Sequence, residues 1–328
     1  MEKKNKLPEL LAPAGSPEAL RAAIGAGADA VYMGASGFNA RIGAANFTPE
    51  SLKDEIARAH EAGVRIYLTL NTLVYDREIP EMLKTAEAAY LAGADALIVA
   101  DLGVASILRR TFPDLPLHAS TQMSGHNLDA ARKMAELGFE RMVIARETSR
   151  ENLRLICRES PIEIEAFVHG ALCVCHSGQC LFSSIVGGRS GNRGLCAQPC
   201  RLLYSDPQGG KSYPLSLKDL SLAEHLPELI DMGVASLKVE GRMKPPEYVA
   251  GVISIWRRLL DEGRGANREE MRRLAEIFSR QGFTDGYYVN NIGKNMLGIR
   301  TEGDKARSAA KSQDKRSANA PVREPIPD

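Results

Sequence analysis

The feature that most constrains this chain is a repeated alternation of short apolar runs with helical stretches. Nine runs occur, at residues 9–14, 30–34, 65–71, 96–101, 115–121, 141–146, 162–170, 213–219 and 235–241. Most begin about 20–35 residues apart, as βα units require. Several follow a glycine that suits a helix end, such as Gly27, Gly93, Gly138 and Gly233.

These runs predict an α/β fold, a (βα)8 TIM-like barrel in which eight strands close and the ninth is a lid or an extra pairing strand. An open doubly wound sheet is the alternative. So many equal units exceed the usual open sheet, which favours the barrel.

The chain of 328 residues, 44% of them hydrophobic, is long enough for a large barrel with appendages. We expect the barrel over residues 1–250, with a Cys-rich insertion at 170–212 near its C-terminal face. A small C-terminal extension at 251–301 carries helical patterns at 252–262 and 268–281. Residues 302–328 contain no Leu, Met or aromatic residue, which predicts a disordered tail or a truncated linker.

The charge balance limits the kinds of partner. Lys and Arg number 42 against 41 Asp and Glu, so a globally basic nucleic-acid coat is excluded and an anionic partner must meet a local patch. No apolar run approaches the length of a membrane span, and Pro8 and Glu9 interrupt any signal-peptide core. We therefore predict a cytoplasmic protein with reduced thiols and no membrane partner.

Five of the six cysteines crowd into 28 positions. Four of them have the spacing C-x6-C-x15-C-x3-C, namely Cys173, Cys180, Cys196 and Cys200. Four thiolates suit an iron–sulfur cluster or a tetrahedral zinc, and ordinary thiols are the third alternative. The absence of close CxxC pairs and the intervening glycines favour the cluster. Cys157 is expected to be a buried apolar residue, and Cys175 a bystander, an alternate ligand or an oxidation-prone thiol.

The same segment contains no acidic residue. Across the 40 residues between Glu165 and Asp206 lie three arginines, Arg189, Arg193 and Arg201. This composition predicts contact with an anion, either a dicarboxylate metabolite or RNA phosphate. The alternative is that glycine-rich metal loops simply carry few charges.

Polar residues follow the predicted strands and converge on one mouth if the barrel forms. We expect Asn71, Gln122, Arg146 and Arg242 to contact substrate there. His169 is the acid/base candidate, with support of the cluster as its alternative role. Lys238 and Glu240 alternate on one strand, so both face the same side and are further catalytic candidates. The chain lacks HExxH, GxSxG, GxGxxG and Walker motifs.

Four segments together resemble the collagenase-like peptidase family U32. They are LLAPAGS at 10–16, EAFVHGALCVCHSGQC at 165–180, SLKDL at 216–220 and LKVEGR at 237–242. The resemblance covers about residues 8–300. The family was named for suspected proteolysis, but many members are iron–sulfur proteins of hydroxylation reactions, including ubiquinone hydroxylation without oxygen.

Some members are prephenate-dependent RNA hydroxylation factors that act on tRNA wobble uridine or on a 23S rRNA cytidine. The resemblance therefore implies a 4Fe-4S cluster on Cys173, Cys180, Cys196 and Cys200, prephenate as a small anionic cosubstrate, and ribosomal or transfer RNA as partner. Segments 278–287 and 296–300 resemble the longer rRNA-type members, which implies a missing C-terminal domain. The alternatives are a U32 peptidase and a non-catalytic, metal-stabilised RNA-binding module.

Overall fold

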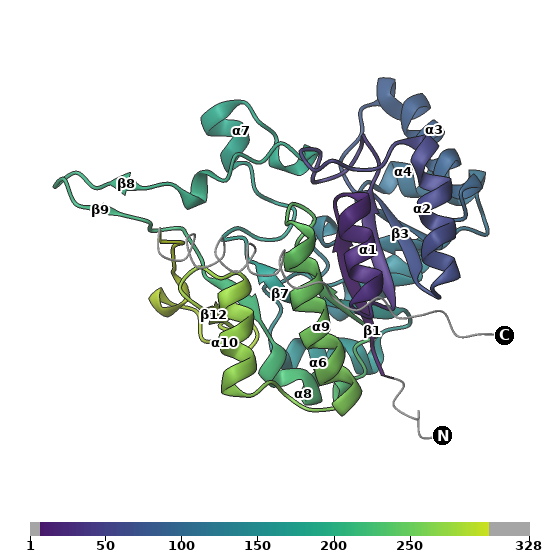
Figure 1. Cartoon of the computed structure of the whole chain (residues 1–328). Helices are drawn as coiled ribbons and strands as arrows, with labels where there is room; N and C mark the ends of the chain where they lie inside the picture. The colour runs from purple at the N-terminus through teal and green to yellow at the C-terminus, as the bar shows by residue number, and fades with distance from the viewer. Residues whose placement is uncertain (1–6, 302–328) are drawn as a thin grey trace.

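Eight parallel strands close into a barrel in the computed structural model, which describes residues 7–301 (Figure 1). The strands are β1 (Glu9–Ala14), β2 (Ala30–Gly34), β3 (Arg65–Leu70), β4 (Ala96–Val99), β5 (Leu117–Ala119), β6 (Arg141–Val143), β7 (Glu163–Ala171) and β11 (Ser236–Val239). Each pairs in parallel with its neighbour in the order β11-β1-β2-β3-β4-β5-β6-β7, and β7 pairs with β11 to close the ring. The predicted TIM-like barrel is confirmed.

The apolar run at residues 213–219 does not join the barrel and provides an extra pairing strand outside it. Its end forms β10 (Asp219–Ser221), which runs antiparallel to the end of β7 and parallel to β12 (Phe283–Thr284). Asp219 is the register partner of Ala171. The residues between them therefore leave β7 and return to the same point.

Helices surround the barrel. They are α1 (Pro17–Gly25), α2 (Pro49–Glu61), α3 (Ile79–Leu91), α4 (Leu102–Thr111), α5 (Leu128–Glu136), α6 (Arg150–Glu159), α8 (Leu226–Met232) and α9 (Pro246–Glu262). Side chains at Ser16, Asp101, Asn127 and Ser149 cap the first turns of α1, α4, α5 and α6. The glycines predicted at the helix ends have φ between 73° and 88°. This left-handed backbone turns each helix directly into the next strand.

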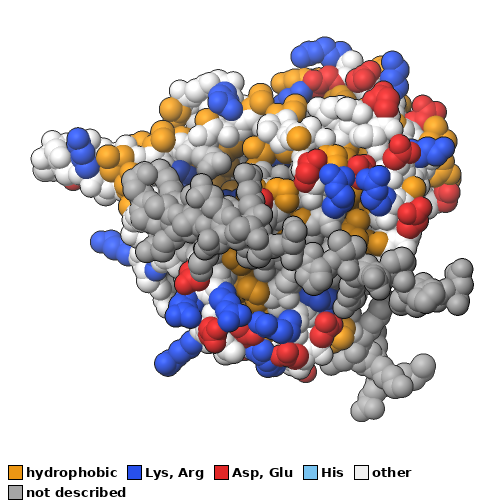
Figure 2. Space-filling view, viewed as in Figure 1, with side chains coloured by type: hydrophobic (Ala, Val, Ile, Leu, Met, Phe, Trp, Pro, Cys, Tyr) orange, Lys and Arg blue, Asp and Glu red, His pale blue; other side chains and the backbone are white. Residues whose placement is uncertain are grey.

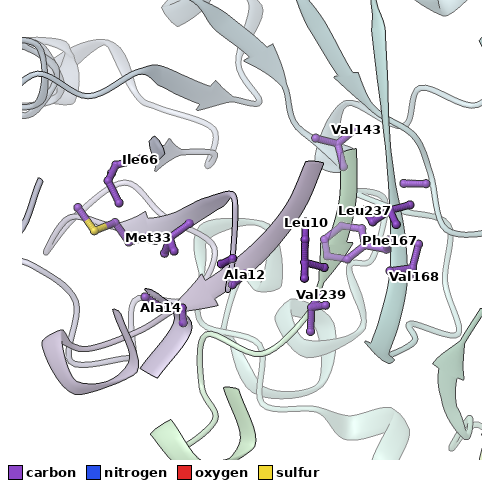
Figure 3. Packing of buried hydrophobic residues seen from close by; sticks show 14 of the residues in the cluster. Leu10, Ala12, Ala14, Met33, Ile66, Val143, Phe167, Val168, Leu237 and Val239 are labelled. Atoms are coloured by element: carbon purple, nitrogen blue, oxygen red, sulfur yellow. The ribbon is translucent and has the colours of Figure 1, made fainter. Parts of the chain in front are cut away.

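Residues alternate between two apolar regions along each strand. One side packs against the helices, where Leu10, Ala12, Met33 and Ile66 lie in the main core (Figure 3). The other side faces the barrel interior, where Leu11, Tyr32, Tyr67 and Ile98 form a second small cluster. The small interior cluster leaves room for charged side chains in the centre of the barrel.

The Cys-rich segment projects from the C-terminal face of the barrel (Figure 1). It contains α7 (Phe182–Gly187) and a hairpin of β8 (Tyr204–Ser205) and β9 (Lys211–Ser212). Figure 2 shows few acidic side chains over this projection and many over α2 and α3. Short 3-10 helices occur at Asp76–Glu78, Thr121–Met123, Gly191–Arg193, Pro199–Arg201, Ala223–His225 and Lys294–Met296.

The two helical patterns predicted after the barrel strands are both present, as α9 and as α10 (Arg268–Ile277). α9 crosses the boundary expected at residue 250 and packs on α1 and β1, so it serves as the last helix of the barrel ring. The tail expected at 302–328 lies outside the described residues. Within residues 7–301, none of the helices is long and apolar enough to cross a membrane.

Candidate active site at the barrel mouth

Charged side chains of alternating sign occupy the barrel interior. The Glu165 carboxylate accepts hydrogen bonds from Lys238 Nζ at 2.8 Å and from Arg141 Nη1 at 3.2 Å. Arg141 Nη1 also donates to Glu9 at 2.7 Å. Glu165 is fully buried, and the other three side chains are at most 7% exposed. Each buried charge therefore has a partner of opposite sign, as burial in a low-dielectric interior requires.

Glu240 lies at the mouth above this interior chain. Its Oε2 accepts hydrogen bonds from Arg146 Nη2 at 2.7 Å and from Arg41 Nη2 at 3.2 Å. Burial alone raises the pKa of Glu240, but Arg41 and Arg146 outweigh burial and lower that pKa to about 2. The carboxylate is therefore ionised at neutral pH.

Arg242 is a third arginine at the mouth, and it is 4% exposed. Its Nη1 donates to Thr69 Oγ1 at 2.7 Å and to Asn39 Oδ1 at 3.2 Å. Within residues 7–301, no carboxylate forms an ion pair with it. Burial and the nearby Arg41 lower the pKa of Arg242 to about 10. Three arginines thus share the single carboxylate of Glu240, which leaves the mouth positively charged and suited to an anion.

Asn71 and Gln122 stabilise the loop that carries Arg41. Asn71 Oδ1 accepts from the backbone N–H of Ala40 at 3.0 Å, next to Arg41. Gln122 Nε2 donates to the backbone carbonyl of Asn71 at 2.5 Å. Both residues therefore lie at the mouth, as predicted, and position its loops. Their direct contact with substrate stays a prediction.

His169 lies on the helix-facing side of β7, where its ring packs against Tyr248, Trp256 and Phe283. Its Nδ1 is buried without a hydrogen-bond partner. Burial lowers the pKa of His169 to about 3, so the ring is neutral at neutral pH. The aromatic ring contacts of His169 thus lie outside the barrel interior, and its acid/base role stays a prediction.

The four predicted cysteine ligands all lie in the Cys-rich segment that follows β7. Burial raises the pKa of Cys200, and the negative charges of Cys173, Cys196 and Cys180 raise it further. Cys200 therefore lies near the other three thiols, and four thiolates are a donor set that suits an iron–sulfur cluster. As they stand, however, no three His, Cys, Asp or Glu side chains among residues 7–301 are grouped to hold a metal ion. The ligand assignment stays a prediction.

Arg41 links the thiols to the mouth. Its pKa is raised first by Glu240 and also by Cys173 and Cys196. The side chain is 35% exposed and forms an ion pair with Glu240 at 3.2 Å. The sequence analysis missed Arg41 because it lies in the loop after β2, several residues beyond the strand end. It also missed Arg141 and the ion pairs of Glu165. The signal that could have found them is the presence of polar residues at the starts of β6 and β7.

The three arginines of the acid-free segment do not form one open patch. Arg193 binds Glu78, which lies outside the segment, at 2.6 and 3.0 Å. Arg201 donates to the carbonyl oxygens of Leu172 and Leu217, and Arg189 to that of Leu195. Glu78 therefore neutralises Arg193 from outside the segment, and contact of the three arginines with an anionic partner stays a prediction. All three guanidinium groups help to fold the segment.

Cys157 and Cys175 complete the set of thiols. Cys157 is half-buried against the core, and burial raises its pKa to about 12, in agreement with an apolar role. Burial and the adjacent Cys180 raise the pKa of Cys175. Cys175 therefore lies beside a predicted ligand, and its role stays open between the three alternatives.

The fold and the site define an α/β barrel with a thiol-rich rim and a cationic mouth. The sequence profile of peptidase family U32 matches residues 15–297, and the chain belongs to this family. The 23S rRNA 5-hydroxycytidine C2501 synthase of Escherichia coli is 41% identical over 297 residues, which are 88% of this chain and 44% of that protein. The chain thus spans less than half of that relative.

Other relatives carry different names. The tRNA hydroxylation protein P1 of Bacillus subtilis is 39% identical, covering 78% of this chain and 64% of that protein. A protein of Porphyromonas gingivalis named collagenase is 37% identical, covering 86% of this chain and 73% of that protein. The solved U32 peptidase Mk0906 aligns with 52% of this chain and 72% of that chain at a TM-score of 0.44 and 16% identity, a likeness too weak to carry an argument.

Proposed function

We propose that this chain is an iron–sulfur unit of RNA hydroxylation, acting on a 23S rRNA cytidine in preference to a tRNA wobble uridine. A 4Fe-4S cluster on Cys173, Cys180, Cys196 and Cys200 and prephenate as cosubstrate belong to the proposal. The observation that carries it is the position of Arg41, which binds Glu240 and lies in the backbone stretch 39–42 that packs against Gly194 of the Cys-rich segment. This contact supports a single site made of the thiols and the cationic mouth. Two relatives named for RNA hydroxylation support this assignment.

The chain's own residues bind and orient the cosubstrate in this proposal. Arg41, Arg146 and Arg242 supply guanidinium donors that match carboxylates. Glu240, ionised by its arginine neighbours, holds Arg41 and Arg146 in place. Lys238 supplies a buried ammonium 4.2 Å from the Tyr32 ring centroid. The cluster, when bound, supplies one-electron redox chemistry or an iron site for an oxygen-bearing group.

A peptidase is the second candidate, because one relative is named collagenase. A hydrolytic site needs a nucleophile beside a base, or a metal. In the described part of the chain, the side-chain hydrogen bonds of histidine rings go to carboxylates and one carbonyl, not to Ser or Cys. This geometry favours hydroxylation over proteolysis. The non-catalytic RNA-binding module remains as a third outcome of the test below.

The test compares RNA nucleosides by mass spectrometry in cells with and without the gene. Loss of one hydroxylated nucleoside on deletion, restored by the native gene, is the expected result. Cys200→Ala should abolish restoration and the brown colour of anaerobically purified protein. Arg242→Gln should reduce restoration and keep the colour, because it removes a substrate contact and not a ligand.

Cys157→Ala is the matched control and should behave as native, since this thiol is remote from the rim. Stoichiometric zinc without sulfide would overturn the cluster. An unchanged nucleoside profile on deletion, with a peptidase activity lost in His169→Ala, would favour the peptidase. An unchanged profile with RNA binding but no peptidase activity would favour the binding module.

A further inference from the structure

A second group of cations lies on the rim, around the ring of Phe278. Lys244 Nζ lies 2.9 Å from the ring centroid, Arg300 Cζ 4.4 Å and Arg280 Cζ 5.2 Å. These residues come from three segments: the start of α9, the turn between α10 and β12, and the end of the described chain. We call Lys244, Phe278, Arg280 and Arg300 the Phe278 cluster.

This cluster has too few anions for its cations. Asp219, 1% exposed, forms an ion pair with Arg280, and its Oδ2 has no hydrogen-bond partner among residues 7–301. Among the same residues, the buried Nε of Arg300 also has none. Arg201 lies in electrostatic range of both Arg280 and Asp219. In the part of the chain that the structure describes, these four cations therefore form one ion pair, between Arg280 and Asp219.

Two arginines elsewhere on this side of the chain do have a carboxylate partner. On the far end of α9, Arg258 and Arg264 both bind the buried carboxylate of Glu270, at 2.7 and 2.8 Å. In the Phe278 cluster, by contrast, burial and the neighbouring Arg280 lower the pKa of Lys244 to about 7, and Arg300 lowers it further. Partly buried like charges raise the energy of the folded state, and such arrangements are typical of sites that bind a charged ligand.

We propose that the Phe278 cluster binds a phosphodiester group of the RNA substrate. This inference rests on the function proposed above and adds a place where the backbone of the RNA is bound. Lys244, Arg280 and Arg300 are half-buried, so they remain open to a long ligand at the rim. A small dicarboxylate can bind the three arginines of the mouth and does not need the Phe278 cluster.

The location also suits a nucleotide that extends over the mouth. Lys244 is in electrostatic range of Glu240, and Tyr248 beneath it donates a hydrogen bond to the backbone carbonyl of Glu240 at 3.0 Å. The acid-free Cys-rich segment adjoins the cluster through Arg201. A backbone phosphate at the Phe278 cluster therefore lies on the same rim as the thiols and the mouth.

The experiment measures binding of a labelled single-stranded RNA oligonucleotide as a function of salt. The test variant is Lys244→Met/Arg300→Met, because neither residue forms an ion pair with a carboxylate among residues 7–301. The control is Arg268→Met/Arg272→Met, which removes the same charge from the exposed surface of α10. Each lost phosphate contact should lower the salt slope by about 0.7 and, at about 0.1 M salt, the affinity by about fivefold.

We expect the test variant to bind about 25-fold more weakly than native, and the control to bind as native does. Equal effects of the two variants, or no RNA binding by the native chain, would overturn the inference. So would loss of prephenate binding with unchanged RNA binding, which would assign the cluster to the small anion. The assay needs no modification reaction. If the test variant has a normal salt slope and the nucleoside profile is intact, only this inference is refuted. If the test variant has a reduced slope but the chain causes no RNA modification in cells, only the proposed function is refuted.

Discussion

Replacing Glu165 by Gln tests whether the charge chain inside the barrel is an electrostatic unit. Glu165 is fully buried and is the carboxylate that Lys238 contacts directly, whereas Arg141 keeps Glu9 and Glu163. Removing one partner of a buried ion pair costs about 3–5 kcal/mol. Because Lys238 loses its carboxylate partner while Arg141 loses one of three, and Gln can still accept a hydrogen bond, we expect about 3 kcal/mol of lost stability.

Glu163→Gln is the matched control. Glu163 lies on the same strand and binds the same Arg141 at 2.6 Å, but its side chain is 57% exposed. An exposed pair contributes at most about 1 kcal/mol. The two variants therefore make the same chemical change to partners of one arginine. They differ in burial and in the contact with Lys238, which Glu165 makes and Glu163 does not.

Urea unfolding followed by the fluorescence of Trp256, the single and fully buried tryptophan, measures both changes. The expected loss for Glu165→Gln corresponds to a melting temperature lower by roughly 6–12 °C. Lys238→Met in the Glu165→Gln background should add less than it does alone, because the two charges interact. Equal losses for Glu163→Gln and Glu165→Gln would refute the reasoning.

Three further predictions follow from the rim. The pKa of Lys244 falls from 10.5 to about 7 on folding, so the unfolded chain binds more protons than the folded chain between these pH values. Stability should therefore rise with pH in this range. Lys244→Met should flatten the rise, as measured by urea midpoints. Gly178→Ala should speed proteolysis of the Cys-rich segment, because the added Cβ would overlap the backbone carbonyl of Gln122 and φ is left-handed at 77°. Gly187→Ala should not, because its added Cβ has no described neighbour within 4 Å. Anaerobic removal of iron by a chelator should bleach the native protein as Cys200→Ala does, while the free energy of urea unfolding of the barrel changes by less than about 1 kcal/mol.

The barrel could be predicted from sequence because strand periodicity and helix-end glycines are local signals. The runs at 9–14 and 30–34 became strands with the same bounds, since each strand is buried on both sides and is therefore almost entirely apolar, with the ion-paired Glu9 as the exception. The run at 213–219 was harder to place. Its end pairs antiparallel with β7, which depends on where the chain returns after the Cys-rich segment and not on its own composition.

The site could be predicted only where residues lie at strand ends. Arg146, Lys238, Glu240 and Arg242 lie in or next to the mouth because the topology of a barrel places the ends of parallel strands there. Arg41 lies in a long loop, and its partner Glu240 is 199 residues away. Contacts of that sequence separation leave no periodic pattern, so the charge surplus of the mouth became visible only in the folded chain.

The pairing of Ala171 with Asp219 has a consequence for how this protein can vary. Register partners in an antiparallel pair lie about 5 Å apart, so the segment between them begins and ends at almost the same point in space. Doubling the length of such a closed loop adds only about 0.6 kcal/mol of closure entropy. The segment can therefore lengthen, shorten or exchange its contents as a module while the eight strands keep their register. Selection can change the chemistry on the rim with little penalty to the barrel that supports it.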